Sequence, residues 1–133
     1  MKRKIGLMGL MGLMGLLGLM GCAKASREEM AMNTVLESYE ALLAGDYETF
    51  LKGRAYMDSI PESYREQLLV LYKQFVRQQE AAHQGIVSFV PTHVEEDSLL
   101  QVMQVFMMVN YGDSTREEIV VPMVEVNGTW LMK

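Results

Sequence analysis

The chain has 133 residues, with 12 Lys and Arg against 17 Asp and Glu, so its formal net charge is −5 at pH 7. This length suits one domain with a single hydrophobic core, and the acidic balance without a basic cluster excludes a nucleic-acid-binding role. Cys22 is the only cysteine, which excludes an internal disulfide and a thiolate metal site.

The amino-terminal segment combines a short basic start with a long uncharged run. Lys2, Arg3 and Lys4 precede residues 5–21, which are mostly Leu, Met and Gly and lead directly to Cys22. A basic region followed by an apolar region is typical of a secretory signal peptide. The length of the run would also allow a short membrane-spanning helix. Glycine at every third position lowers its helix propensity, which favours the signal peptide.

The run ends in Leu19-Met20-Gly21-Cys22, which resembles the lipobox of bacterial lipoprotein precursors. The resemblance implies that residues 1–21 are removed by cleavage between Gly21 and Cys22, and that the Cys22 thiol carries lipid. The mature chain would then have 9 basic and 17 acidic residues, a net charge of −8. One acyl chain holds a protein at a bilayer only marginally, so we expect two or three on Cys22.

The next segment carries the start and end signals of a helix. After a short tether at 22–27, Ser26 and Glu29 have the spacing of a capping box. Gly45 suits the left-handed position that ends a helix. Between these points, apolar residues at intervals of three and four predict one buried face: Met32, Val35, Leu36, Tyr39, Leu42 and Leu43.

Two further helices are predicted before residue 86. Asp46 can cap a short helix that runs to about Lys52, so that the first two helices form a corner. Pro61 fits the first turn of a long helix that Gly85 ends. Its apolar stripe consists of Tyr64, Leu68, Leu71, Tyr72, Phe75 and Val76.

From residue 86 onward, β-branched and aromatic residues alternate with turn signals, which predicts a four-stranded antiparallel meander. The second strand is apolar on both faces, so it is either central or covered by a partner. Pro122 predicts a bulge or an edge position, and Asn127-Gly128 predicts a tight hairpin. The predicted strands are Ile86–Glu95, Leu99–Tyr111, Glu117–Val126 and Thr129–Met132. The fold class is therefore α+β, with the helices packed on one face of a curved sheet.

This order of elements, with Ala-Gly-Asp-Tyr-Glu at 44–48 and Asn-Gly-Thr-Trp at 127–130, resembles the nuclear-transport-factor-2-like (cystatin-like) superfamily over residues 28–133. The segments 41–50, 60–68 and 112–130 are similar to small envelope lipoproteins of unknown function that are common in Bacteroidota. The resemblance implies a cone-shaped domain, often dimeric, and no particular activity. Because no acidic residue directly follows the cysteine, it also implies anchoring in the outer membrane on the periplasmic side.

Five side chains are candidates to line a pocket in such a cone: Tyr39, Tyr72, Phe75, Met103 and Tyr111. For Tyr39 and Tyr72, core packing with the hydroxyl at the rim is the competing interpretation. Nearly every carboxylate falls in a turn, a cap or a polar helix face, and neither His83 nor His93 has a partner at metal-ligand spacing. The sequence therefore predicts no catalytic residue, no metal and no cofactor.

Three functions are consistent with this pattern. The first is a lipid-anchored, non-catalytic envelope module that binds an envelope protein or a second copy of itself. The second is a small-ligand binder or an enzyme, which would need a buried acid with a raised pKa beside Tyr or His in the cone. The third is a structural dimer that pairs through an exposed apolar sheet face.

Overall fold

The structure is a computed structural model that describes residues 26–133. The predicted signal peptide, its cleavage site at Gly21 and the predicted lipidation site at Cys22 lie outside the described residues. Among residues 26–133, no helix is both long enough and apolar enough to cross a membrane.

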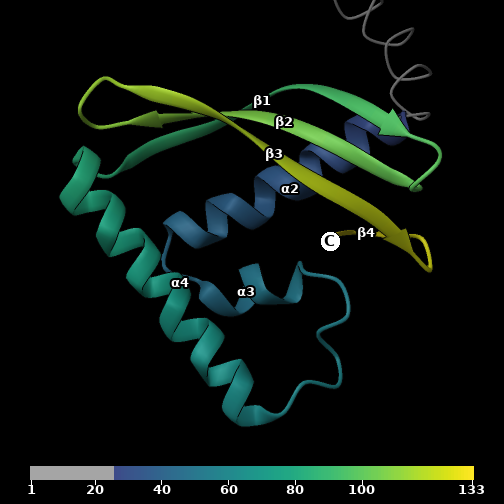
Figure 1. The fold of residues 1–133 in the computed structure, drawn as a ribbon, viewed down its shortest axis with the longest axis horizontal. Helices are drawn as coiled ribbons and strands as arrows, with labels where there is room; N and C mark the ends of the chain where they lie inside the picture. Colours follow the sequence, from purple (N-terminus) through teal and green to yellow (C-terminus); the bar gives the residue numbers. More distant parts are fainter. Residues whose placement is uncertain (1–25) are drawn as a thin grey trace, which may run out of the picture.

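Three helices precede four strands. The helices are α2 (Arg27–Leu43), α3 (Tyr47–Lys52) and α4 (Glu62–His83), and the strands are β1 (Ile86–Asp97), β2 (Val102–Tyr111), β3 (Arg116–Val126) and β4 (Thr129–Met132). The strands form one antiparallel sheet in the order β1-β2-β3-β4. The helices all lie on one side of this sheet, with α2 nearest to it (Figure 1). The predicted α+β class is confirmed.

The ends of the first two helices follow local sequence signals. The Ser26 hydroxyl accepts a hydrogen bond from the Glu29 backbone N–H at 3.1 Å, and the Glu29 carboxylate accepts one from the Ser26 N–H at 3.2 Å. Asp46 caps α3 by accepting hydrogen bonds from the hydroxyl and backbone N–H of Thr49, which lower the pKa of Asp46. Gly45, at φ +84°, makes the corner between the two helices.

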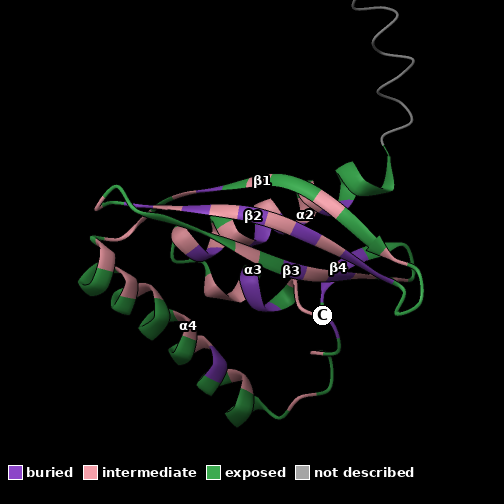
Figure 2. Ribbon diagram, turned by 45° about the horizontal axis from the view of Figure 1, so that its top comes forward, coloured by how far each residue is buried: buried purple, intermediate pink, exposed green. Residues whose placement is uncertain are grey.

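The core lies between α2 and the inner face of the sheet. Met103, Val105 and Met107 of β2 are at most 1% exposed, and Ala31 and Val35 of α2 are 0% exposed. Figure 2 shows buried residues along α2 and the sheet, whereas α4 is mostly exposed or half-buried. β2 is therefore a central strand, which is the first of the two alternatives that its apolar faces predicted.

The long helix α4 covers less of the sheet than its apolar stripe suggested. Leu68 is its only buried residue, and Tyr64, Leu71 and Phe75 remain 45%, 55% and 41% exposed. Figure 1 shows that α4 approaches the sheet at its carboxyl end and diverges from it toward its start. Because α2 covers the sheet, much of the apolar side of α4 remains exposed.

The second strand begins later than predicted. Leu99 was expected to start it, but β2 starts at Val102. One carboxylate oxygen of Asp97 accepts hydrogen bonds from the backbone N–H groups of Leu99 and Leu100, both at 3.1 Å. These bonds form a turn in place of the first residues of the strand.

Pro122 lies where β3 becomes an edge. Its pairing with β2 is regular, so there is no bulge at this residue, and the register shifts of the sheet are in β1 instead. The Pro122 carbonyl accepts a hydrogen bond from the Lys133 N–H at 2.9 Å. The backbone N and O of one strand residue point to the same side of the strand. The nitrogen of Pro122 therefore points past the end of β4, where it has no strand residue to donate to, so its missing N–H removes no hydrogen bond of the sheet.

Candidate functional site

A groove opens between α4 and the sheet. Its larger section has a volume of about 400 Å³ and is walled mainly by apolar and aromatic side chains, among them Phe75, Phe89 and Tyr111. A smaller section of about 250 Å³ is lined by Tyr72 and Arg54. Both sections are lined by Tyr39, Val120 and Val121, so they are adjoining parts of one groove.

Aromatic rings fix the position of Tyr39 at the junction of the two sections. Its ring lies edge-to-face against Phe50 and Phe89, with centroids 5.2 Å and 4.8 Å away. Phe50 packs in the same way on Tyr72 at 4.9 Å. Edge-to-face contacts of this kind are favourable, and they define this part of the groove wall.

The structure places four of the five pocket candidates along this groove: Tyr39, Tyr72, Phe75 and Tyr111. Met103 does not join them. It is 1% exposed, belongs to the core beneath α2, and lines a different cavity near the start of that helix. The inward-facing pattern of β2 places Met103 on the inner face of the sheet, but α2 covers that part of the face.

Arg54, which the sequence reasoning did not single out, ends the smaller section. Its Nη1 donates a hydrogen bond to the Tyr72 hydroxyl at 2.9 Å, and no ion pair within residues 26–133 includes it. Burial raises the pKa of Tyr39, and the positive charge of Arg54 offsets part of that rise. The groove therefore ends in a half-buried guanidinium that faces aromatic side chains.

Arg54 is held in place by backbone hydrogen bonds between its neighbours in the chain and the last strand, β4. The Ala55 N–H donates to the Met132 carbonyl and the Met132 N–H donates to the Gly53 carbonyl, both at 2.7 Å. They make a parallel bridge between Arg54 and Met132. This bridge joins residues far apart in the chain, so no local sequence signal could have indicated the placement of Arg54.

A second polar group lies at the Tyr111 end of the groove. The Tyr111 hydroxyl donates a hydrogen bond to the Glu117 carboxylate. The His83 ring stacks on Tyr111 with centroids 4.1 Å apart, and its Nδ1 lies 3.2 Å from a carboxylate oxygen of Asp113. Hydrogen bonds from Thr115, and then His83, lower the pKa of Asp113.

Burial, helped by the hydrogen bond to Glu117, raises the pKa of Tyr111 to about 12. The phenol therefore stays protonated at neutral pH, where it can donate a hydrogen bond but cannot act as a base. Among the described residues that line the groove, Glu117 is the only one with a carboxylate side chain, and it is exposed. The described groove thus offers hydrogen bonds, the half-buried positive charge of Arg54 and the exposed one of Lys133, but no buried acid side chain.

Alkaline titration should identify Tyr111. An unfolded tyrosine titrates near pH 10, whereas the pKa of Tyr111 in the folded chain is about 12. The stability that this difference contributes is complete below about pH 10 and is lost as the pH rises toward 12. We expect the ultraviolet absorbance of ionised tyrosine to show a late step whose amplitude Tyr111→Phe lowers by one tyrosine; the pKa of Tyr39 is also raised. Tyr56→Phe, a change at a side chain 72% exposed, should leave that step in place; a late step of unchanged amplitude in Tyr111→Phe would contradict the assignment.

Comparison with known proteins identifies the fold. No protein-family model matches the sequence, and no curated protein matches it. The crystal structure of a Campylobacter jejuni protein, named as a proposed transpeptidase of nuclear-transport-factor-2-like type, is similar to this chain with a TM-score of 0.59. The fold is nuclear-transport-factor-2-like. The similarity covers 76% of this chain and 94% of the other at 8% identity, so it extends to the fold alone.

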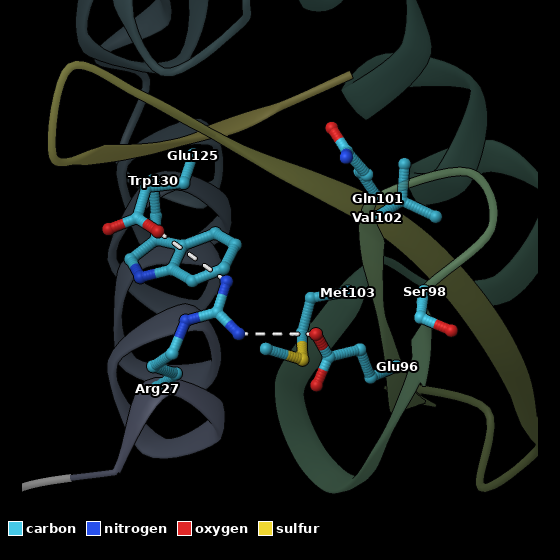
Figure 3. A pocket seen from close by; sticks show the side chains of 8 residues that line it. All are labelled: Arg27, Glu96, Ser98, Gln101, Val102, Met103, Glu125 and Trp130. Carbon is cyan, nitrogen blue, oxygen red and sulfur yellow. Dashed lines mark hydrogen bonds and ion pairs between the residues drawn. The ribbon is translucent and has the colours of Figure 1, made fainter.

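The nuclear-transport-factor-2-like domain has a second cavity, of about 370 Å³, beside the start of α2 (Figure 3). The Arg27 guanidinium lies 3.2 Å from a carboxylate oxygen of Glu96 and 3.5 Å from one of Glu125. Its Cζ is 5.2 Å from the centre of the Trp130 ring. These charges are already paired, so Arg27 links α2 to β1 and β3 by ion pairs.

In residues 26–133, no cluster of three or more His, Cys, Asp or Glu side chains could hold a metal ion.

Proposed function

We propose that this protein is a lipid-anchored envelope protein whose nuclear-transport-factor-2-like domain binds, without catalysis, an apolar ligand with an anionic end. The observation that carries the proposal is the groove between α4 and the sheet, which is aromatic along its wall and ends at the unpaired Arg54. The proposed anchor is the lipid on Cys22, and the proposed location is the periplasmic side of the outer membrane. In these respects the protein would be one of the small lipoproteins common in Bacteroidota.

The chemistry of the groove favours this class of ligand. Binding sites for small molecules are concave and mostly apolar, with a few polar groups that fix orientation. A guanidinium binds a carboxylate or another oxyanion through two parallel hydrogen bonds, and Arg54 has its remaining N–H groups available for them. The Tyr111 hydroxyl and His83 lie toward the other section, where they could contact a polar group of the same ligand.

We do not extend the transpeptidase activity in the name of the Campylobacter protein to this chain. Acyl transfer requires a nucleophile such as Ser, Thr or Cys beside a base. The described residues that line the groove include none of these three types, and Cys22 is assigned to the anchor.

Two fluorescent probes test the groove. Anilinonaphthalene sulfonate has an apolar body with an anionic end, and phenylnaphthylamine has the same rings without the sulfonate. We expect Arg54→Gln to weaken sulfonate binding roughly tenfold to a hundredfold, the effect of losing a charge-assisted hydrogen bond. Binding of the uncharged probe should change little. Equal losses for both probes, or the same losses from Arg77→Gln at an exposed site on α4, would overturn the assignment.

A separate experiment tests the anchor. A Cys22→Ser precursor should incorporate no labelled fatty acid and should remain uncleaved at Gly21, whereas Ser26→Ala should be labelled and cleaved as the original chain is. The measurements are fatty-acid incorporation in cells and the mass of the product. Lipid incorporation into Cys22→Ser would contradict the proposed anchor and leave the groove proposal to be judged by its own test.

The outer face of the sheet supports a second candidate, self-association. Val90 on this face is 45% exposed, and it pairs with Met108 of the central strand. A row of apolar side chains on a face that no described helix covers is suited to a second copy of the domain. A concentration-dependent mass in sedimentation that Val90→Lys abolishes would support this candidate.

A further inference from the structure

The turn between β1 and β2 presents two adjacent leucines to solvent. Leu99 is 91% exposed and Leu100 is 61% exposed. The turn is nevertheless well defined, because Asp97 accepts hydrogen bonds from both of their backbone N–H groups and Gln101 closes it at φ +56°. Satisfied N–H groups and outward apolar side chains are what a segment needs to enter an apolar environment.

This turn lies beside the point where the described chain begins. Arg27, the first residue of α2, pairs with Glu96 at the end of β1 at 3.2 Å. The cavity at this end is lined by Arg27 and by Ser98 and Gln101 of the turn (Figure 3). Figure 1 shows the start of α2 and the β1–β2 turn at the same end of the domain.

Covalent geometry limits how far this end can lie from a lipid on Cys22. Four residue steps separate Cys22 from Ser26, and a fully extended chain covers at most about 14 Å in four steps. The start of α2, and the turn that Arg27 holds against it, must therefore remain close to the bilayer surface.

We propose that Leu99 and Leu100 insert into the bilayer that holds the Cys22 lipid and form a second membrane contact. This inference rests on the proposed lipid anchor. Insertion removes two exposed leucine side chains from water, which is favourable for each of them. The carboxylates of Glu95, Glu96 and Asp97 flank the pair and would be repelled by anionic lipid, so the surface recognised is one of zwitterionic lipid.

A second membrane contact would also fix the orientation of the domain relative to the membrane surface. β2 runs from the leucine turn to Tyr111 over ten residues, a length of about 30 Å in an extended strand. The Tyr111 end of the groove is thus held away from the membrane surface, where a ligand in the aqueous space can reach it.

The test uses the full acylated protein in phosphatidylethanolamine and phosphatidylcholine vesicles. Because the Cys22 thiol is blocked by lipid and no other cysteine is present, Leu99→Cys provides one free thiol for a polarity-sensitive fluorophore. Ser114→Cys, in the β2–β3 turn at the opposite end of the sheet, provides the matched control. We expect a blue shift and quenching by lipids that carry bromine on their acyl chains for the label at 99, and neither for the label at 114.

The outcomes separate the two proposals. Protein that sediments with the vesicles while the label at 99 behaves like the label at 114 overturns the leucine contact and leaves the anchor intact. Protein that does not sediment, with a reactive Cys22 thiol, overturns the anchor and with it this inference. Replacing part of the lipid with phosphatidylglycerol should weaken quenching at 99; stronger quenching would overturn the preference for zwitterionic lipid.

Discussion

Replacing Trp130 with alanine should lower the free energy of unfolding by about 3–5 kcal/mol. The indole is 5% exposed and is part of the core cluster that includes Met103 and Met123. Its removal would leave a large cavity between α2 and the sheet, and it would also remove the ring over which Arg27 lies at 5.2 Å. Denaturant unfolding, followed by circular dichroism, measures the change.

Leu131→Ala is the matched control for this prediction. Leu131 is the next residue of β4 and points to the other face of the sheet, where it is only half-buried. We expect its removal to cost much less than the removal of Trp130, because fewer apolar contacts are lost. Similar losses in the two variants would show that β4 does not close the core through Trp130.

Met103→Ala should mainly lower the stability of the domain, whereas Phe75→Ala should mainly weaken binding in the groove. Met103 is 1% exposed in the core, so its truncation should lower the free energy of unfolding by about 2–5 kcal/mol and leave the affinity of the groove for phenylnaphthylamine nearly unchanged. Phe75 is 41% exposed on the groove wall. Its truncation should cost little stability but weaken the binding of both probes.

Unfolding curves and probe titrations on the same two variants check this prediction. Conditions must keep Met103→Ala folded, since a partly unfolded population would lower the apparent affinity without any change in the groove. Loss of probe affinity in folded Met103→Ala would show that the groove extends beneath α2. Unchanged probe affinity in Phe75→Ala would show that the probes bind elsewhere.

Local signals in the sequence account for most of the backbone. Ser26 and Asp46 cap helices because their side-chain oxygens reach N–H groups three residues ahead. Asn127 and Gly128 both have positive φ, at 51° and 81°, as a tight hairpin requires. Such interactions involve neighbours in the chain, so the residue types alone could indicate them.

The groove could be predicted only in part, because its shape depends on contacts between distant segments. The helical and strand patterns placed Tyr39, Phe75 and Tyr111 on the apolar faces of their helices and strand. They could not show that α2, rather than α4, covers the sheet, because an apolar stripe does not specify the surface that meets it. Met103 was assigned to the pocket and Arg54 was overlooked for this reason.

The bridge between Arg54 and Met132 has a consequence for dynamics. The amides of Ala55 and Met132 exchange with solvent only when the loop and the last strand separate. An anion bound to Arg54 stabilises the closed arrangement by mass action, so hydrogen exchange at these two amides would slow as ligand is added. Occupancy of the groove would then be recorded in the hydrogen exchange of the loop after α3 and of the carboxyl-terminal strand.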